Sequence, residues 1–133
     1  MIFGIGTDIA ETKRFEKWIN NPEMISRFFN SKEINFTGTL ASRCQHLAAR
    51  FAAKEAFSKA LGTGLIYDLK DSYIINNDLG KPELILENTA KELFEKYCGK
   101  YEDYKIHISL SHEKEYALAY VIIEKTGGDN GNF

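Results

Sequence analysis

The chain has little of what marks secreted, membrane-spanning or metal-clustered proteins. Among its 133 residues only Cys44 and Cys98 are cysteines, and they lie far apart and outside any metal-ligand spacing. Charged residues interrupt every hydrophobic segment, so no apolar run approaches the roughly 18 residues of a membrane span. The first residues lack the charged and then apolar pattern of a signal peptide. We therefore expect a reduced, cytoplasmic protein with no membrane partner.

An excess of positive charge is also missing. The 17 lysines and arginines face 19 acidic residues, and the formal net charge of -2 excludes the global basic field of nonspecific nucleic-acid binding. The stretch GIGTDI at residues 4–9 lacks the further glycine of a dinucleotide fingerprint, and no Gly-x-x-x-x-Gly-Lys-Ser/Thr loop occurs. The length fits one ordinary domain. We expect a single domain with no nucleic-acid partner.

Apolar periodicity divides the chain into helices and paired strands. Short or alternating apolar segments predict strands at 1–10, 71–77, 81–87, 104–112 and 116–124. Helical spacing predicts helices at 11–20, 41–61 and 88–99, of which the second is the longest and ends at Gly62. Strands in pairs, separated by helices, predict an α+β domain over residues 1–125, with a mainly antiparallel sheet packed around the long central helix. Residues 126–133 are expected to form a flexible tail.

Side chains at two helix starts allow specific predictions. Asn88 or Thr89 is expected to cap the helix at 88–99, with Glu92 completing a Thr-x-x-Glu capping box. Asp8 has the same spacing to Glu11 and can be the cap of the helix at 11–20. Asp8 can equally be a metal ligand, because a carboxylate at the end of a rigid strand holds a fixed negative charge. Both interpretations stay open from this segment alone.

The central helix contains the stretch ARFAAKEAFSKALGTG at residues 49–64. Four alanines fall on one side of it at about 100° per residue and allow close packing, namely Ala49, Ala53, Ala56 and Ala60. Glu55 and Lys59 lie on another side, four residues apart, in the favourable order for a helical ion pair worth about 0.2–0.5 kcal/mol. Their neighbours are mostly alanine and phenylalanine. The alternative to the ion pair is therefore a half-buried cleft with a binding role.

The stretch SLSH at residues 109–112 ends a predicted strand. Ser109 and Ser111 share a side of that strand, and a serine–histidine hydrolase is one interpretation. The nucleophile elbow Gly-x-Ser-x-Gly is absent, and a polar hairpin turn accounts for Ser111 and His112. His112 remains open as a contact for phosphate or substrate.

Four stretches in this order carry a resemblance that covers almost the whole chain. They are GIGTDI at 4–9, RFAAKEAFSKALGTG at 50–64, GKP at 80–82 and ISLSHEKEYALAYVI at 108–122. Together they resemble the holo-acyl-carrier-protein synthases, the single-lobe type of phosphopantetheinyl transferase. The family transfers the phosphopantetheine arm of coenzyme A to a serine of an apo-acyl-carrier protein, with Mg²⁺, and releases adenosine 3',5'-bisphosphate. A noncatalytic coenzyme A or nucleotide-binding module of the same fold is the competing interpretation.

The resemblance implies a role for individual residues. Asp8 and Glu55 match the family's metal-binding carboxylates, and Lys59 matches a lysine at the reacting phosphates. The resemblance makes these three residues catalytic, and it leaves open whether Lys59, Glu55 acting through water or metal-bound water takes the proton of the serine. The residues that it places near coenzyme A are Arg50, Lys59, Gly62 and His112.

Partner surfaces are implied as well. Arg14 matches the basic site of the first helix that docks the carrier protein. Lys13 and Lys17 are added from local patterning, because with Arg14 they form a positive patch beside Trp18 that suits an acidic helix. An ordinary solvated face is the alternative for these two lysines. The resemblance also implies a homotrimer with active sites between subunits.

Two segments depart from the family pattern. The segment at 36–48 is shorter and less basic than usual, so coenzyme A contacts from it are not carried over. After the strand at 81–87 the family commonly has glycine, where this chain has Glu87 and Asn88. Because asparagine tolerates a positive φ better than most residues, we expect the turn itself to be kept.

Overall fold

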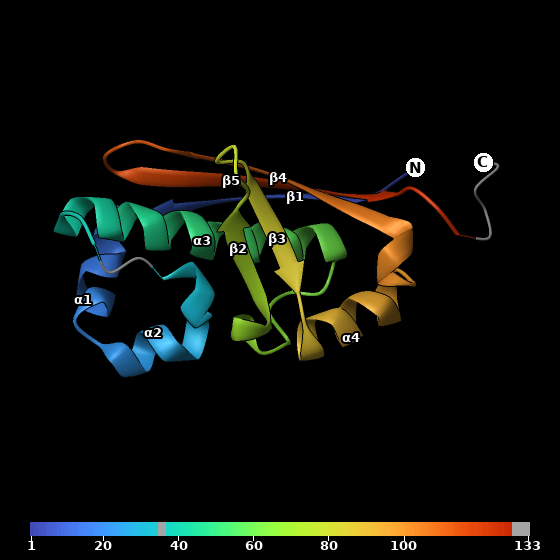
Figure 1. Cartoon of the computed structure of the whole chain (residues 1–133), viewed down its shortest axis with the longest axis horizontal. Coiled ribbons are helices and arrows are strands. Elements are labelled where there is room, and N and C mark those ends of the chain that lie inside the picture. Colours follow the sequence, from blue (N-terminus) through green and yellow to red (C-terminus); the bar gives the residue numbers. More distant parts are fainter. Residues whose placement is uncertain (35–36, 129–133) are drawn as a thin grey trace.

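A long helix lies at the centre of the molecule. The computed structural model describes residues 1–34 and 37–128, and places α3 (Leu40–Leu61) between a three-stranded sheet and a layer of shorter elements (Figure 1). The sheet has the order β1-β5-β4 with antiparallel neighbours, from β1 (Ile2–Glu11), β4 (Tyr104–His112) and β5 (Tyr116–Lys125). A separate antiparallel pair consists of β2 (Ser72–Asn76) and β3 (Pro82–Leu86). The α+β class with antiparallel sheets around a long helix is confirmed.

Small residues hold β1 unusually close to α3. A Cβ added at Gly4 would lie 1.9 Å from the Ala60 carbonyl oxygen, and one at Gly6 would lie 2.0 Å from that of Ala56. The alanines predicted to form one side of the helix are buried, which confirms their packing role. Only glycine permits this approach of strand backbone to helix backbone. Because side chains alternate between the two faces of a strand, Asp8, two residues beyond Gly6, also points toward α3.

The segment after Asp8 differs from the prediction. β1 continues to Glu11, which pairs with Tyr116, and a single 3-10 turn η1 (Thr12–Phe15) precedes the short helix α1 (Glu16–Ile19). Because β5 offers a backbone partner to Glu11, the strand runs one residue further than predicted, and the helical turns begin at Thr12. Asp8 pairs with Ala119 inside the strand, so its interpretation as a helix cap is wrong. α2 (Pro22–Phe28) and the turn η2 (Ser31–Glu33) follow.

The last helix, α4 (Asn88–Tyr97), is also capped differently from the prediction. Its N-cap position is Glu87, which makes no side-chain cap bond. The Thr89 hydroxyl and backbone N–H both donate to the Asp71 carboxylate from the turn η3 (Leu69–Asp71), so the predicted capping box is wrong. Asn88 has a φ of 43°, which confirms the turn expected there. The turn η4 (Tyr101–Asp103) leads from α4 into β4.

A buried ion pair joins α3 to the layer of shorter elements. The side chains of Lys54 and Glu33 are both 0% exposed, and the Lys54 ammonium donates to the Glu33 carboxylate. The ammonium also donates to three backbone carbonyls, those of Phe28, Leu69 and Ser72, at 3.0, 2.8 and 2.7 Å. Glu33 accepts in turn from the backbone N–H of Ile74 at 2.9 Å. Within the described ranges, none of the helices has the length and apolar character that a membrane crossing requires.

Candidate active site

Asp8, Glu55 and Lys59 meet where β1 passes α3. The Lys59 ammonium donates to Asp8 Oδ1 at 3.1 Å and to the Thr7 carbonyl at 3.0 Å. The Lys59 side chain is 54% exposed and that of Asp8 is 20% exposed. No ion pair joins Lys59 to Glu55 among the residues that the structure describes, so the helical ion pair is replaced by a contact between helix and strand. The three groups therefore lie at an open edge of the molecule.

The electrostatics of Glu55 reflect this arrangement. Burial of the half-buried carboxylate raises the pKa of Glu55, and the negative charge of Asp8 raises it further. The positive charges of Lys59 and Arg14 act in the opposite direction. Two carboxylates that repel each other across a shared space are a natural pair of ligands for a cation.

The donor set is consistent with Mg²⁺ that is shared with a substrate. Mg²⁺ usually keeps several waters and binds one or two protein carboxylates together with substrate phosphates. Asp8 and Glu55 supply two carboxylates. In the part of the chain that the structure describes, no cluster of three or more potential ligands exists, so phosphate and water oxygens would have to complete the coordination.

Arg50 is the second unusual group of α3. It is 8% exposed, and its Nε is buried without a hydrogen-bond partner. Burial lowers the pKa of Arg50, and the nearby negative charge of Glu33 opposes that effect. Its side chain makes no ion pair or hydrogen bond with any described residue. A buried cation without such a partner is costly unless a bound anion satisfies it.

Arg50 and His112 are not brought to the carboxylates within one chain. At about 100° per residue, Lys59 lies about 180° around α3 from Arg50. His112 ends β4 and is exposed, whereas Asp8 lies on β1, so the two stand on opposite edge strands, which are about 10 Å apart with β5 between them. One copy of the chain thus carries these groups in two separate places, on different flanks of the central helix.

The serine–histidine hydrolase is excluded by the strand register. Ser111 pairs with Leu118 and His112 pairs with Ala117, and successive residues of a strand point to opposite faces. Ala117 is buried on the face toward α3, so Ser111 points to the other face, away from His112.

Gly62 ends α3 as predicted. It has a φ of 87°, and its N–H bonds to the Ser58 carbonyl at 2.9 Å. Because this conformation is left-handed, glycine is the residue best suited to it. The helix end that it forms lies one turn beyond Lys59.

Arg14 lies over buried aromatic rings and close enough to Glu55 to act on its charge. Its guanidinium carbon is 5.9 Å from the Trp18 ring centroid and 4.9 Å from that of Phe51. Lys13 and Lys17 are exposed beside it. The two rings are buried, so the exposed surface beside the carboxylate pair is formed by the three positive side chains.

Sequence reasoning missed the buried partnership of Lys54 with Glu33. A signal was present, because Lys54 is seven residues from both Leu47 and Leu61 and so shares their face of the helix. Both leucines are buried, and a lysine on such a face needs internal partners.

Comparison with known proteins identifies the class that these features define. The profile of the 4'-phosphopantetheinyl transferase superfamily matches residues 4–121, so the chain belongs to this superfamily of transferases. Within it, the chain is 47% identical over 128 residues to the holo-[acyl-carrier-protein] synthase of Treponema denticola, covering 93% of this chain and 99% of that one. It is 42% identical over 134 residues to the synthase of Clostridium novyi, covering 99% and 94% of the two chains. The resemblance found in the sequence is confirmed.

Solved structures agree with this assignment. The holo-(acyl-carrier-protein) synthase of Bacillus anthracis, in complex with CoA (3',5'-ADP), matches with a TM-score of 0.74 and 36% identity over 94% of this chain and 98% of that one. The synthase of Neisseria meningitidis matches with a TM-score of 0.79 and 32% identity over 94% and 100%.

Proposed function

We propose that this chain is a cytoplasmic holo-[acyl-carrier-protein] synthase that serves fatty acid biosynthesis. It would transfer the 4'-phosphopantetheine arm of coenzyme A to a serine of apo-acyl-carrier protein and release adenosine 3',5'-bisphosphate. The observation that carries the proposal is the meeting of Asp8, Glu55 and Lys59 on β1 and α3. The superfamily match and the coenzyme A complex of a similar synthase support it.

Asp8 and Glu55 would hold the Mg²⁺ ion. Without a cation, two carboxylates would repel the diphosphate of coenzyme A. When bound there, Mg²⁺ would offset the charge that develops on the phosphoryl oxygens. These two carboxylates would suffice as protein ligands if phosphate and water oxygens supplied the rest of the coordination.

Lys59 would neutralise the diphosphate. Its ammonium now shares one half-exposed contact with Asp8, and exposed pairs of this kind are worth about 0–1 kcal/mol, so little is lost when it turns to a phosphate. Either Lys59 or Glu55 acting through water would take the proton from the carrier serine. Proton removal and charge neutralisation would thus both come from the flank of α3 that faces β1.

A neighbouring copy would complete the site. Arg50 and His112 of one subunit would bind coenzyme A beside the carboxylates of the next, with Gly62 at the same helix end as Lys59. This follows from the position of the two sets of groups on different flanks of α3. A closed homotrimer allows every copy to supply both halves.

The outer face of the sheet supports such an assembly. Ile5, Ile9 and Tyr120 point away from α3 and are 64%, 60% and 48% exposed. Contiguous apolar side chains of this kind mark interaction surfaces. We propose that this face forms the contact between the three copies, which sedimentation would test; an active monomer would contradict it.

Mixed oligomers test the shared site directly. Arg50→Ala and Glu55→Ala should each be inactive alone, whereas a refolded mixture should regain part of the activity, because some interfaces combine two intact halves. A mixture of Glu55→Ala with Asp8→Ala is the matched control and should stay inactive, since both changes remove the same half. Equal recovery in both mixtures, or in neither, would argue against a site between subunits.

The carrier protein would dock on the surface formed by Arg14, Lys13, Lys17 and Trp18. Its positive charge suits an acidic helix, and the buried Trp18 ring supports the Arg14 guanidinium from below. The surface adjoins Glu55, so a bound carrier would present its serine near the carboxylates.

The decisive experiment is mass spectrometry of an apo-carrier protein incubated with the chain, coenzyme A and Mg²⁺. We expect the carrier to gain the mass of the phosphopantetheine arm, and to gain nothing when a chelator removes the metal. Retained coenzyme A binding with no mass gain on any of several carriers would assign the chain to the noncatalytic binding modules instead.

A further inference from the structure

A second cavity lies away from the candidate active site. It has a volume of about 510 Å³ and lies among α1, α2, η2, η3 and the first turns of α3. This volume is within the ~300–1,000 Å³ typical of small-molecule pockets. None of the carboxylates, cations or turn residues assigned to the active site lines it. The cavity is therefore a place separate from the candidate active site.

The walls of this cavity are apolar. Ile19, Ile25, Phe29 and Ile34 line it from four successive segments of the chain. Ile25 and Phe29 are 5% and 1% exposed, so they belong to the core and form a preformed wall. Ile19 and Ile34 are half-buried, and an aliphatic chain would replace water against these two side chains.

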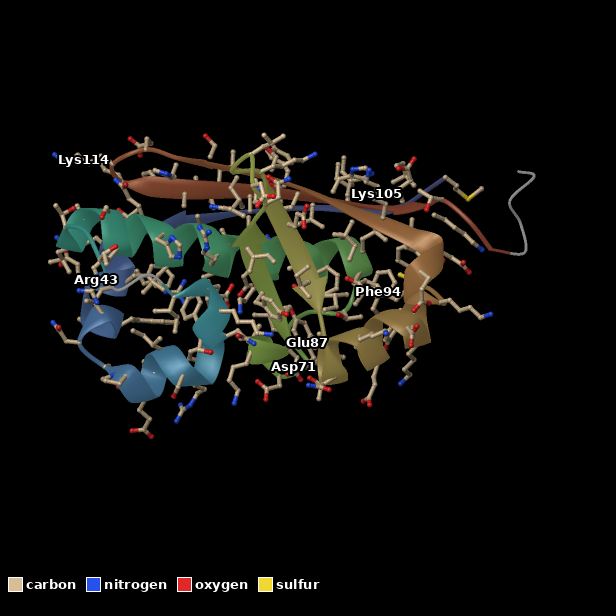
Figure 2. The ribbon with its side chains drawn as sticks, in the orientation of Figure 1. Arg43, Asp71, Glu87, Phe94, Lys105 and Lys114 are labelled. Atoms are coloured by element: carbon tan, nitrogen blue, oxygen red, sulfur yellow. The ribbon has the colours of Figure 1, made fainter. Side chains whose placement is uncertain are left out.

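The rim of the same cavity is positive. Arg43 and Lys70 both line it, and none of the described residues that line it is acidic. The Arg43 side chain forms no ion pair or hydrogen bond with any described residue, and its Nε is buried without a partner. Figure 2 shows Arg43 beneath the N-terminal end of α3, on the side of α1. Among the described residues, the Lys70 ammonium has one ion-pair contact, which is with Asp68 at 3.9 Å.

The charge of this rim distinguishes it from the other hollows. The hollow at η1 and the β4–β5 turn is lined by three glutamates, and the one between β3 and β4 includes Glu83. An apolar interior with an unpaired guanidinium at its edge matches a molecule with an aliphatic body and one anionic end.

We propose that this cavity binds a medium-chain aliphatic carboxylate. The carboxylate would accept hydrogen bonds from the Arg43 guanidinium, with Lys70 as a second positive charge, while the chain lies against Ile19 and Ile34. Such a site would let a free fatty carboxylate bind the protein without entering the transfer site.

Calorimetric titration of the full chain with hexanoate, octanoate and decanoate tests the apolar part. Affinity should rise about fourfold for each methylene that becomes buried. Decan-1-ol, which lacks the charge, should bind at least tenfold more weakly than decanoate, and decyltrimethylammonium should not bind. Equal binding of decanoate and decan-1-ol, or no dependence on chain length, would overturn the proposal.

Two variants test the position of the site. Arg43→Gln should weaken decanoate binding tenfold or more, whereas Arg27→Gln, an exposed arginine of α2 that does not line the cavity, should leave it unchanged. Ser26→Trp places a large ring at the exposed rim and should abolish binding without removing a core side chain. Equal weakening by Arg43→Gln and Arg27→Gln would show general charge attraction only. Loss of carrier binding in Ser26→Trp with no saturable binding of any carboxylate would assign the cavity to a protein partner and overturn the proposal.

Discussion

Lys54 and Glu55 are neighbours in the sequence and differ in almost every physical respect. Lys54 is fully buried, and its ammonium donates hydrogen bonds to one carboxylate and three backbone carbonyls. Glu55 is half-buried, its pKa is raised by burial and by Asp8, and its carboxylate has no ion-pair partner within the described residues. The step of about 100° along the helix turns Lys54 toward the shorter elements and Glu55 toward β1.

The difference separates a structural charge from a functional one. A buried ion pair is tolerated when its remaining hydrogen bonds are satisfied, and the bonds of Lys54 and Glu33 meet this condition. Asp8 and Glu55 leave their repulsion unresolved at an open edge, where a bound cation can relieve it. The Lys54–Glu33 pair, whose partners are all within the protein, positions α3. The carboxylates of Asp8 and Glu55 can act on a ligand.

The largest expected effect is on transfer activity, when either carboxylate of the candidate active site is removed. Asp8→Ala and Glu55→Ala should each abolish Mg²⁺-dependent transfer from coenzyme A, a loss of more than about a thousandfold or ~4 kcal/mol of transition-state stabilisation. Stability should change by less than ~1 kcal/mol, because the groups are partly exposed. Transfer measured by mass spectrometry, with circular dichroism as the folding control, checks this. Retained activity in either variant would contradict the metal assignment.

Removing one member of the buried Lys54–Glu33 pair should instead lower the stability of the fold. Lys54→Met leaves Glu33 buried without its partner and should lower the free energy of unfolding by about 3–5 kcal/mol, as seen in urea denaturation. Lys59→Met is the matched control on the same helix and should change it by less than ~1 kcal/mol while reducing transfer. If Lys54→Met does not fold at all, Glu33→Gln tests the same pair, since its amide oxygen still accepts from Ile74. A loss below ~1 kcal/mol in both would remove the structural role.

The sequence was informative where local pattern and tertiary structure agree. The long helix, its end at Gly62 and both strand pairs follow from periodicity and glycine chemistry. The extension of β1 through Glu11 did not, because strand length is decided by β5, more than a hundred residues away. The capping of α4 by Asp71 was hidden for the same reason.

The candidate site divides in the same way. Glu55 and Lys59 share a helix, so their proximity was expected from sequence. The contact of Lys59 with Asp8 depends on the packing of Gly4 and Gly6 against α3, which no local pattern reports. The separation of Arg50 from Lys59 follows from helical periodicity and could be read from the sequence, whereas the separation of His112 from Asp8 is a property of sheet order.

A smaller effect is expected at the docking surface beside Glu55. Arg14→Glu should weaken carrier binding about tenfold, mainly through a slower association rate, because a positive rim charge attracts an acidic partner. Coenzyme A binding should weaken much less. Surface plasmon resonance for the carrier and calorimetry for coenzyme A separate the two, with Lys96→Glu on α4 as an exposed control. Equal losses of both ligands would argue against a docking role.

The smallest expected effect is the contribution of the partly buried His46 to the pH dependence of stability. His46 donates through Nε2 to the Glu33 carbonyl at 2.6 Å, since a carbonyl can only accept, and burial lowers the pKa of His46 below its ordinary 6.5. Below pH 6.5 the unfolded chain therefore binds more protons than the folded one, so the free energy of unfolding falls as pH falls from 6.5 toward the folded pKa. Above pH 6.5 the contribution of His46 to the free energy of unfolding is constant. His46→Gln keeps a donor for Glu33 and removes the titration, so urea denaturation should show a shallower loss of stability between about pH 7 and pH 5 than in the wild type. If the free energy of unfolding depended on pH equally in the two proteins, the fold would not be holding His46 neutral in this range.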